Sequence, residues 1–105
     1  MKPAKKLRLE DAGFKVASAD EFLALTPEES ALVALRLSLA DEVRRRRLRL
    51  HCSQTELARR IGSSQSRIAK LEAAESDVSL DLLFKALFAT GAKRRDLGRI
   101  VAAAR

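Results

Sequence analysis

Hydrophobic residues recur along most of the chain at helical spacing, and capping residues separate the apolar segments. The longest segment begins with Thr-Pro-Glu-Glu at residues 26–29, where threonine suits the N-cap and proline suits the first helical position. Nothing interrupts the pattern before residue 50, which predicts one helix of roughly two dozen residues. One stripe of this helix consists of residues three or four positions apart, namely Leu32, Leu35, Leu39 and Val43.

Three shorter helices are expected next, and each begins at a serine. Ser53 and Glu56 form a capping box for a helix that ends at Gly62, and the pair Ser63-Ser64 caps a second helix over residues 65–73. Ser79 caps the third helix, which ends at Gly91. The apolar residues of this third helix are typical of a core helix: Leu80, Leu83, Phe84, Leu87 and Phe88.

The two ends of the chain predict one further helix each. A capping box at residues 18–21 indicates a short helix through Leu23, and residues 94–103 form a last amphipathic helix that we expect to pack weakly. Strand patterns are too short to found a sheet. The prediction is therefore an all-α fold, with an N-terminal extension over residues 1–26 and one domain over residues 27–105.

Composition and motif content argue against an enzyme. Among 105 residues there is one cysteine, Cys52, beside the one histidine, His51, and adjacent side chains point apart on a helix or a strand. These two residues cannot supply the usual four zinc ligands, and the isolated glycines cannot form a phosphate-binding loop. We therefore expect no catalytic residue, no metal and no cofactor. The longest unbroken apolar run is far too short to span a bilayer, so no membrane partner is expected.

Positive charge is concentrated in the centre of the chain. Residues 41–72 contain nine basic and four acidic side chains, whereas residues 1–40 contain six of each, and the whole chain carries +7. A basic stretch of this kind predicts a polyanionic partner. The run of arginines at 44–47, taken alone, is more typical of a solvated helix face.

Residues 53–73 have the pattern of a helix-turn-helix, in which a tight glycine-containing turn joins two short helices. Ala58 is small enough to let the second helix approach closely, and Gly62 tolerates a positive φ at the turn. Ile68 and Leu71 are predicted to anchor the second helix in the core, which leaves its other face for a ligand.

That outward face carries only hydrogen-bonding side chains, and we expect it to enter the major groove of DNA. Base contacts are predicted for Gln65, Ser66, Arg67 and Lys70. Glutamine pairs with adenine, whereas arginine suits either guanine or a phosphate, and the lysine suits the backbone or a base at the edge of the groove. Phosphate contacts are predicted for Ser53, Gln54 and Ser64.

Residues 39–91 resemble the XRE-type helix-turn-helix domain of phage repressors, because the motif S-Q-T-E-L-A-x-x-I-G-x-S-Q-S-x-I-A-x-L-E is almost complete. Short patterns at 13–16, 20–23, 26–29 and 77–83 are similar to the HigA-like antitoxins, which are encoded beside RelE/HigB-type toxins. The resemblance implies a five-helix, lambda-repressor-like domain with a long N-terminally extended first helix, in the bacterial cytoplasm. The loop after the second helix of the motif departs from the family, because it lacks the usual glycine.

The long helix is apolar over so much of its surface that more than one neighbour should cover it. Between residues 31 and 40 only Arg36 and Ser38 are polar. A second subunit or a partner protein is expected on Leu32, Val33 and Leu37, and the alternative is a helix buried wholly in its own fold. Dimers are expected because one recognition helix covers only a few base pairs, so that two copies would bind a palindromic operator.

The resemblance implies a repressor that acts as the antitoxin of a type II toxin–antitoxin system. Such a protein regulates its own operon and neutralises a small basic RelE/HigB-like toxin that cleaves mRNA, and residues 1–35 are expected to carry part of the toxin contact. Two alternatives stay open. One is an XRE regulator, stand-alone or phage-type, without a toxin, and the other is a protein-interaction module without DNA binding.

Overall fold

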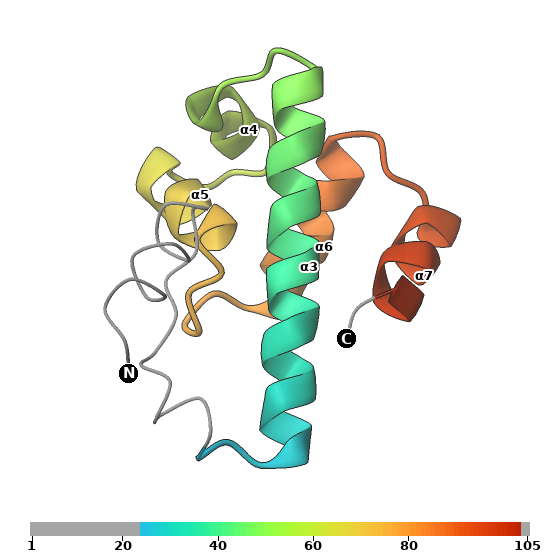
Figure 1. The fold of residues 1–105 in the computed structure, drawn as a ribbon. Helices are drawn as coiled ribbons and strands as arrows, with labels where there is room; N and C mark the ends of the chain where they lie inside the picture. Colours follow the sequence, from blue (N-terminus) through green and yellow to red (C-terminus); the bar gives the residue numbers. More distant parts are fainter. Residues whose placement is uncertain (1–23, 104–105) are drawn as a thin grey trace.

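A single long helix, α3, forms the axis of the fold; α5, α6 and α7 pack against it, and α4 packs against α5 and α6 (Figure 1). The computed structural model describes residues 24–103, which contain α3 (Pro27–Arg49), α4 (Gln54–Arg60), α5 (Gln65–Glu72), α6 (Leu80–Ala89) and α7 (Arg94–Ala103). No strand occurs between residues 24 and 103, and the predicted all-α class with five helices is confirmed. The short helix expected at 18–23 lies outside the described residues.

The helices begin at the residues that the capping signals predict. Ahead of α3, the Thr26 hydroxyl accepts a hydrogen bond from the Glu29 N–H at 3.1 Å, and the Glu29 carboxylate accepts one from the Thr26 N–H at 2.8 Å. Ser53 and Glu56 make the same two bonds at the start of α4, each at 3.0 Å. The serines ahead of α5 and α6 likewise accept a first-turn N–H. These bonds satisfy N–H groups that the helix itself leaves unpaired.

Four of the helices end in the same backbone arrangement, in which one residue adopts a positive φ. After α4 this residue is Gly62, with φ 66°, and the Ser63 N–H donates back to the Ala58 carbonyl at 2.8 Å. Gly91 holds the equivalent position after α6, with φ 95°. Both glycines were predicted at these helix ends from the sequence.

The corresponding residues after α3 and α5 are not glycines. His51 follows α3 with φ 54°, and Ala74 follows α5 with φ 57°. The Glu75 N–H donates back to the Lys70 carbonyl at 3.1 Å, so the end of α5 is closed even though the family's usual glycine is missing. As a result α5 ends at Glu72, one residue before the predicted end.

The hydrophobic core lies where α3 to α6 meet. Five of its fourteen members come from the helix-turn-helix region, and the rest come from α3, α6 and the loops beside them. The core residues are Leu39, Ala40, Val43, Cys52, Leu57, Ala58, Ile61, Ile68, Leu71, Val78, Leu83, Ala86, Leu87 and Ala92. Ile68 and Leu71 have no exposed surface, so they anchor α5 as expected.

The interpretation of α6 as purely a core helix is wrong in part. Leu83 and Leu87 are buried, but Phe88 keeps 45% of its surface exposed because its side of α6 faces away from the other core helices. No residue of α7 is buried, and Leu97 and Ile100 are only partly covered against the core. The expectation of a weakly packed last helix is confirmed.

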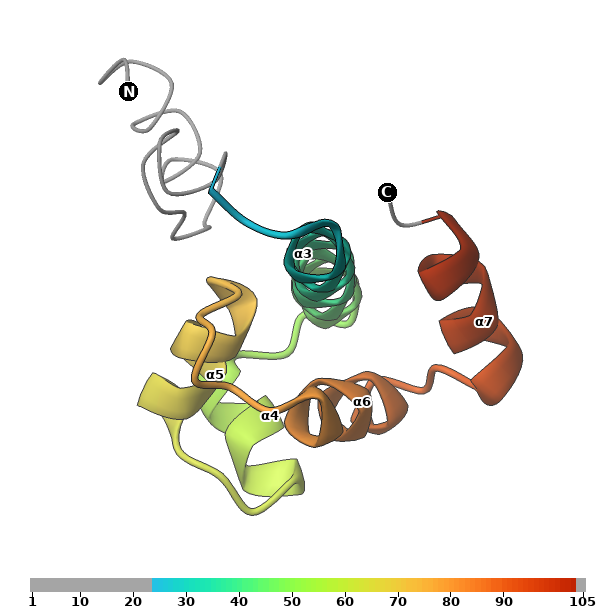
Figure 2. The ribbon, with the colours of Figure 1, turned by 90° about the horizontal axis from the view of Figure 1, so that it is seen from below.

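The shorter helices gather on one side of α3. Figure 2 views α3 nearly end on and shows α5, α4, α6 and α7 in an arc around that side. Figure 1 shows the N-terminal turns of α3 extending past α5 and α6. Within residues 24–103 no helix is long and apolar enough to cross a membrane.

Candidate nucleic-acid interface

The outer face of α5 is polar along its whole length. Gln65, Ser66, Arg67 and Lys70 are all exposed, whereas the opposite face is buried in the core. Because the N-cap of α5 is also exposed, the first turn of the helix is open to a ligand. The structure thus brings together the four residues that the sequence predicts for base contacts.

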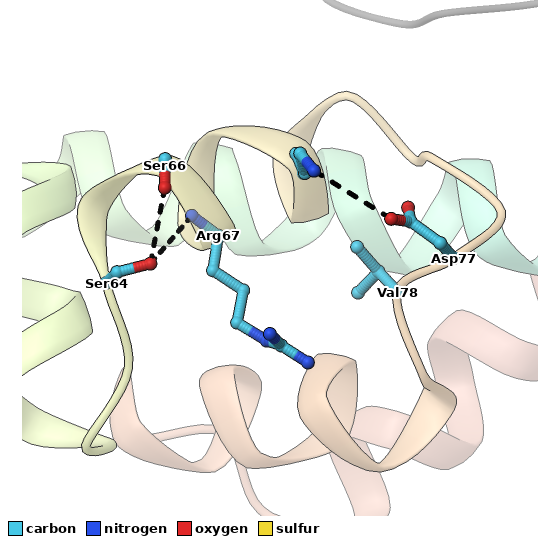
Figure 3. Close-up of a pocket in the computed structure, with 6 residues that line it drawn as sticks. Ser64, Ser66, Arg67, Asp77 and Val78 are labelled. Atoms are coloured by element: carbon cyan, nitrogen blue, oxygen red, sulfur yellow. Dashed lines mark hydrogen bonds and ion pairs between the residues drawn. The ribbon is translucent and has the colours of Figure 1, made fainter.

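These side chains line a pocket that the following loop completes (Figure 3). Ser64, Ser66, Arg67 and Lys70 contribute from the start and outer face of α5, and Asp77 and Val78 contribute from the loop before α6. The Ser64 hydroxyl accepts from the Arg67 N–H at 3.2 Å and lies 3.3 Å from the Ser66 hydroxyl. The Arg67 guanidinium has no partner within residues 24–103 and stays available to a base or a phosphate.

A buried ion pair lies directly behind this face. Arg47 of α3 donates to Glu72 of α5 through two parallel hydrogen bonds, of 2.6 Å from Nε and 2.9 Å from Nη2. The hydrogen bonds to Glu72 raise the pKa of the Arg47 guanidinium above its usual value. Arg47 also donates to the Cys52 carbonyl at 3.0 Å. The sequence-based interpretation of residues 44–47 as a solvated face is therefore wrong for Arg47.

Two glutamines connect this ion pair to the surface. The Gln54 amide donates to the Glu72 carboxylate at 3.1 Å, and the Gln65 amide donates to the Gln54 oxygen at 2.7 Å. A carboxylate only accepts, so Glu72 dictates that the Gln54 nitrogen faces inward and its oxygen faces Gln65. Gln65 must then turn its own nitrogen towards Gln54. Its oxygen and one N–H are left over, which are the two groups that adenine recognition requires.

The comparison with protein families covers this region. Residues 43–91 match the family model described as helix-turn-helix. The chain contains a helix-turn-helix domain. The match supports the XRE family for this domain and a DNA-binding transcription regulator as its class. Comparison with curated proteins and with solved structures gives no match.

The residues predicted to contact phosphates lie at the starts of the two helices in this helix-turn-helix domain. Ser53 and Ser64 are the N-caps of α4 and α5, where unpaired backbone N–H groups favour an anion. Gln54 is half-buried and uses its amide in the bridge to Glu72 and Gln65, which leaves one N–H for a phosphate.

Sequence reasoning missed three residues at this candidate interface: Arg47 and Glu72, which lie buried behind the polar face of α5, and Asp77, which lies beside it. Arg47 and Glu72 lie 25 positions apart, so no helical spacing could relate them. Asp77 lies in a loop without periodicity and reaches the face only because the loop folds back beside α5. The ion pair between Lys70 and Asp77 can therefore be found only from the folded chain.

Two apolar surfaces lie partly or wholly outside the matched region. On the N-terminal half of α3, Leu32 is 42% exposed, and Val33 and Leu37 are half-buried. The second surface is an open apolar groove between α6 and α7, lined mainly by Phe84, Phe88, Leu97 and Val101. The helix-turn-helix domain is therefore flanked on both sides by partly exposed apolar area.

Potential metal ligands do not cluster in the part of the chain that the structure describes. Between residues 24 and 103 no three histidine, cysteine or acidic side chains come close enough to hold a metal ion. Cys52 is buried beneath the start of α4 and is a free thiol.

Proposed function

We propose that this protein is a sequence-specific transcriptional repressor that binds double-stranded DNA as a homodimer on a palindromic operator. Its α5 helix enters the major groove, where Gln65, Ser66, Arg67 and Lys70 meet base edges. Ser53, Gln54 and Ser64 hold the flanking phosphates. The observation that carries the proposal is the bridge from Glu72 through Gln54, which turns the Gln65 nitrogen towards Gln54 and leaves its oxygen and one N–H for a base.

Selection of binding sites from a random duplex library tests this proposal. The protein should enrich one palindromic sequence, and Gln65→Ala should lower affinity for that duplex while largely sparing random DNA. Arg67→Ala should cost about 1–3 kcal/mol on the enriched duplex if the guanidinium reads a base. Arg95→Ala removes the same charge from the exposed surface of α7 and is the matched control.

Two outcomes would contradict the proposal. If Gln65→Ala and Arg67→Ala weaken binding to the enriched duplex and to random DNA by the same factor, neither residue reads sequence. If the wild-type protein binds no duplex at low salt, the chain is a protein-interaction module instead, and its apolar surfaces become the working part of the molecule.

We further propose that this repressor is the antitoxin of a toxin–antitoxin pair and binds a small basic RelE/HigB-like toxin. Two features support this role: the resemblance of the short patterns outside the helix-turn-helix, and the partly exposed apolar half of α3. The test is growth rescue. Expression of the neighbouring gene alone should arrest growth, and co-expression of this chain should restore it. If the neighbouring product is harmless, the chain is a regulator without a toxin.

A further inference from the structure

The loop between α5 and α6 is anchored firmly beside the binding face. The Val78 side chain is 4% exposed and belongs to the core, and its N–H donates to the Glu75 carbonyl at 3.2 Å. From the other side, Arg36 of α3 donates a hydrogen bond to the Val78 carbonyl. The backbone next to Asp77 is therefore held by the core and by α3 at once.

This anchoring keeps the carboxylate of Asp77 close to a cation of the binding face. The Lys70 nitrogen lies 3.9 Å from the Asp77 carboxylate, and the dashed line at Asp77 in Figure 3 marks this ion pair. Both side chains are largely exposed, at 53% and 67%, so the pair contributes little to the stability of the fold. The pair is placed to affect ligand binding instead, because Asp77 lines the same pocket as Ser64, Ser66 and Arg67.

An acidic side chain has opposite effects on the two kinds of DNA that the protein meets. Non-specific affinity comes from cations that neutralise phosphates and release counterions. A lysine that is paired with an acid is less available to a DNA phosphate, and the acid itself repels the phosphate backbone of the DNA. In the major groove, by contrast, a carboxylate can accept a hydrogen bond from the amino group of cytosine.

We propose that Asp77 is a specificity-determining residue of the DNA interface. On non-cognate duplex it withholds Lys70 from the phosphates and weakens binding. On the cognate operator its carboxylate accepts a hydrogen bond from a cytosine amino group, which offsets the repulsion. This inference rests on the proposed DNA-binding function and adds a residue that selects against wrong sequences.

The test compares Asp77→Asn with the wild-type protein on two duplexes of equal length, one enriched from a random library and one of random sequence. Asp77→Asn should raise affinity for the random duplex by about three- to tenfold at low salt, and should steepen the salt dependence by about one phosphate contact. Affinity for the enriched duplex should rise less or fall. The ratio of the two affinities should therefore drop by severalfold.

Two further variants separate this mechanism from a general change of charge. In the Lys70→Gln background, Asp77→Asn should have much less effect on the random duplex, because the lysine that it frees is gone. Glu28→Gln adds the same charge on the exposed first turn of α3, and should leave the ratio unchanged. Thermal melting should show that each variant is folded.

Two results would overturn the inference. If the ratio is unchanged in Asp77→Asn while the wild-type protein still prefers the enriched duplex, Asp77 does not determine specificity and the repressor proposal stands. If the wild-type protein binds no duplex, the repressor proposal and this inference fail together.

Discussion

His51 holds an unfavourable backbone conformation at the end of the longest helix. A φ of 54° places it in the left-handed region, which costs an ordinary residue roughly 1–2 kcal/mol and costs glycine almost nothing. Its side chain is exposed, and it makes no hydrogen bond within the described range. The geometry of the turn therefore dictates the backbone conformation of His51, and its side chain contributes nothing to the core.

Replacing this residue tests the cost of that conformation. His51→Gly should raise the free energy of unfolding by roughly 0.5–1 kcal/mol, because glycine relieves the strain but loses more entropy on folding. Gly62→Ala is the matched opposite: no atom lies within 4 Å of an added Cβ, so a loss of about 1 kcal/mol would be conformational. Chemical unfolding measures both. Lower stability of His51→Gly would contradict this account.

The residues that the sequence placed well are those with local signals. The N-caps of α3 to α6 and the two glycine ends depend on neighbours within a few positions, and they are where the pattern predicts. Arg47 could not be placed in this way, because its partner Glu72 lies on another helix. Ala74 was also beyond reach, since alanine carries no sign that its backbone will take a positive φ.

At the scale of elements, the stability of a short helix such as α4 depends on the hydrogen bonds of its first turn. α4 has seven residues, and Glu56 accepts a hydrogen bond from the Ser53 N–H at 3.0 Å. This hydrogen bond favours the charged carboxylate and lowers the pKa of Glu56 below its ordinary value of 4.5. Glu29 in α3 and Asp96 in α7 have lowered pKa values for the same main reason, a bond from a backbone N–H.

The sign of the pH effect follows from these shifts. A carboxyl group with a lower pKa in the folded protein contributes stability above its unfolded pKa, and the contribution is lost as the pH falls through the folded pKa. The unfolding midpoint should therefore fall as the pH drops below about 4.5, towards the lowered pKa values. Glu56→Gln should make the unfolding midpoint less dependent on pH in this acidic range.

Melting curves from pH 7 to pH 2 would show this effect. Glu28→Gln is the control, because this carboxylate on the same kind of first turn accepts no hydrogen bond within residues 24–103. An equal flattening in both variants would show that general charge repulsion, and not the capping bond, controls the acid transition.

At the scale of the whole molecule, the question is how two copies meet. The fold has principal extents of 38, 26 and 22 Å, and a dimer on a palindrome must place its two α5 helices about one helical turn of DNA apart, or ~34 Å. Leu32, Val33 and Leu37 are the proposed contact surface. They belong to the N-terminal half of α3, where Leu32 is 42% exposed and Val33 and Leu37 are half-buried.

Sedimentation of surface variants tests this arrangement. The wild-type protein should be a dimer at micromolar concentration, and Leu32→Gln combined with Leu37→Gln should shift it towards monomer and weaken operator binding. Leu48→Gln, at a residue 50% exposed near the other end of α3, should leave the dimer intact. A dimer that survives the double change but dissociates in Phe88→Gln would place the interface in the groove between α6 and α7.

The bridge from Glu72 through Gln54 also restricts how this protein could evolve towards a new operator. Position 65 faces an oxygen whose direction is dictated from the core, and a donor side chain there keeps the bond to Gln54. Glutamate would set two acceptors against each other, whereas an apolar side chain would leave this exposed oxygen to water. A lineage that changes its preferred base at this position would therefore lose the oriented bridge unless it remained among donor side chains.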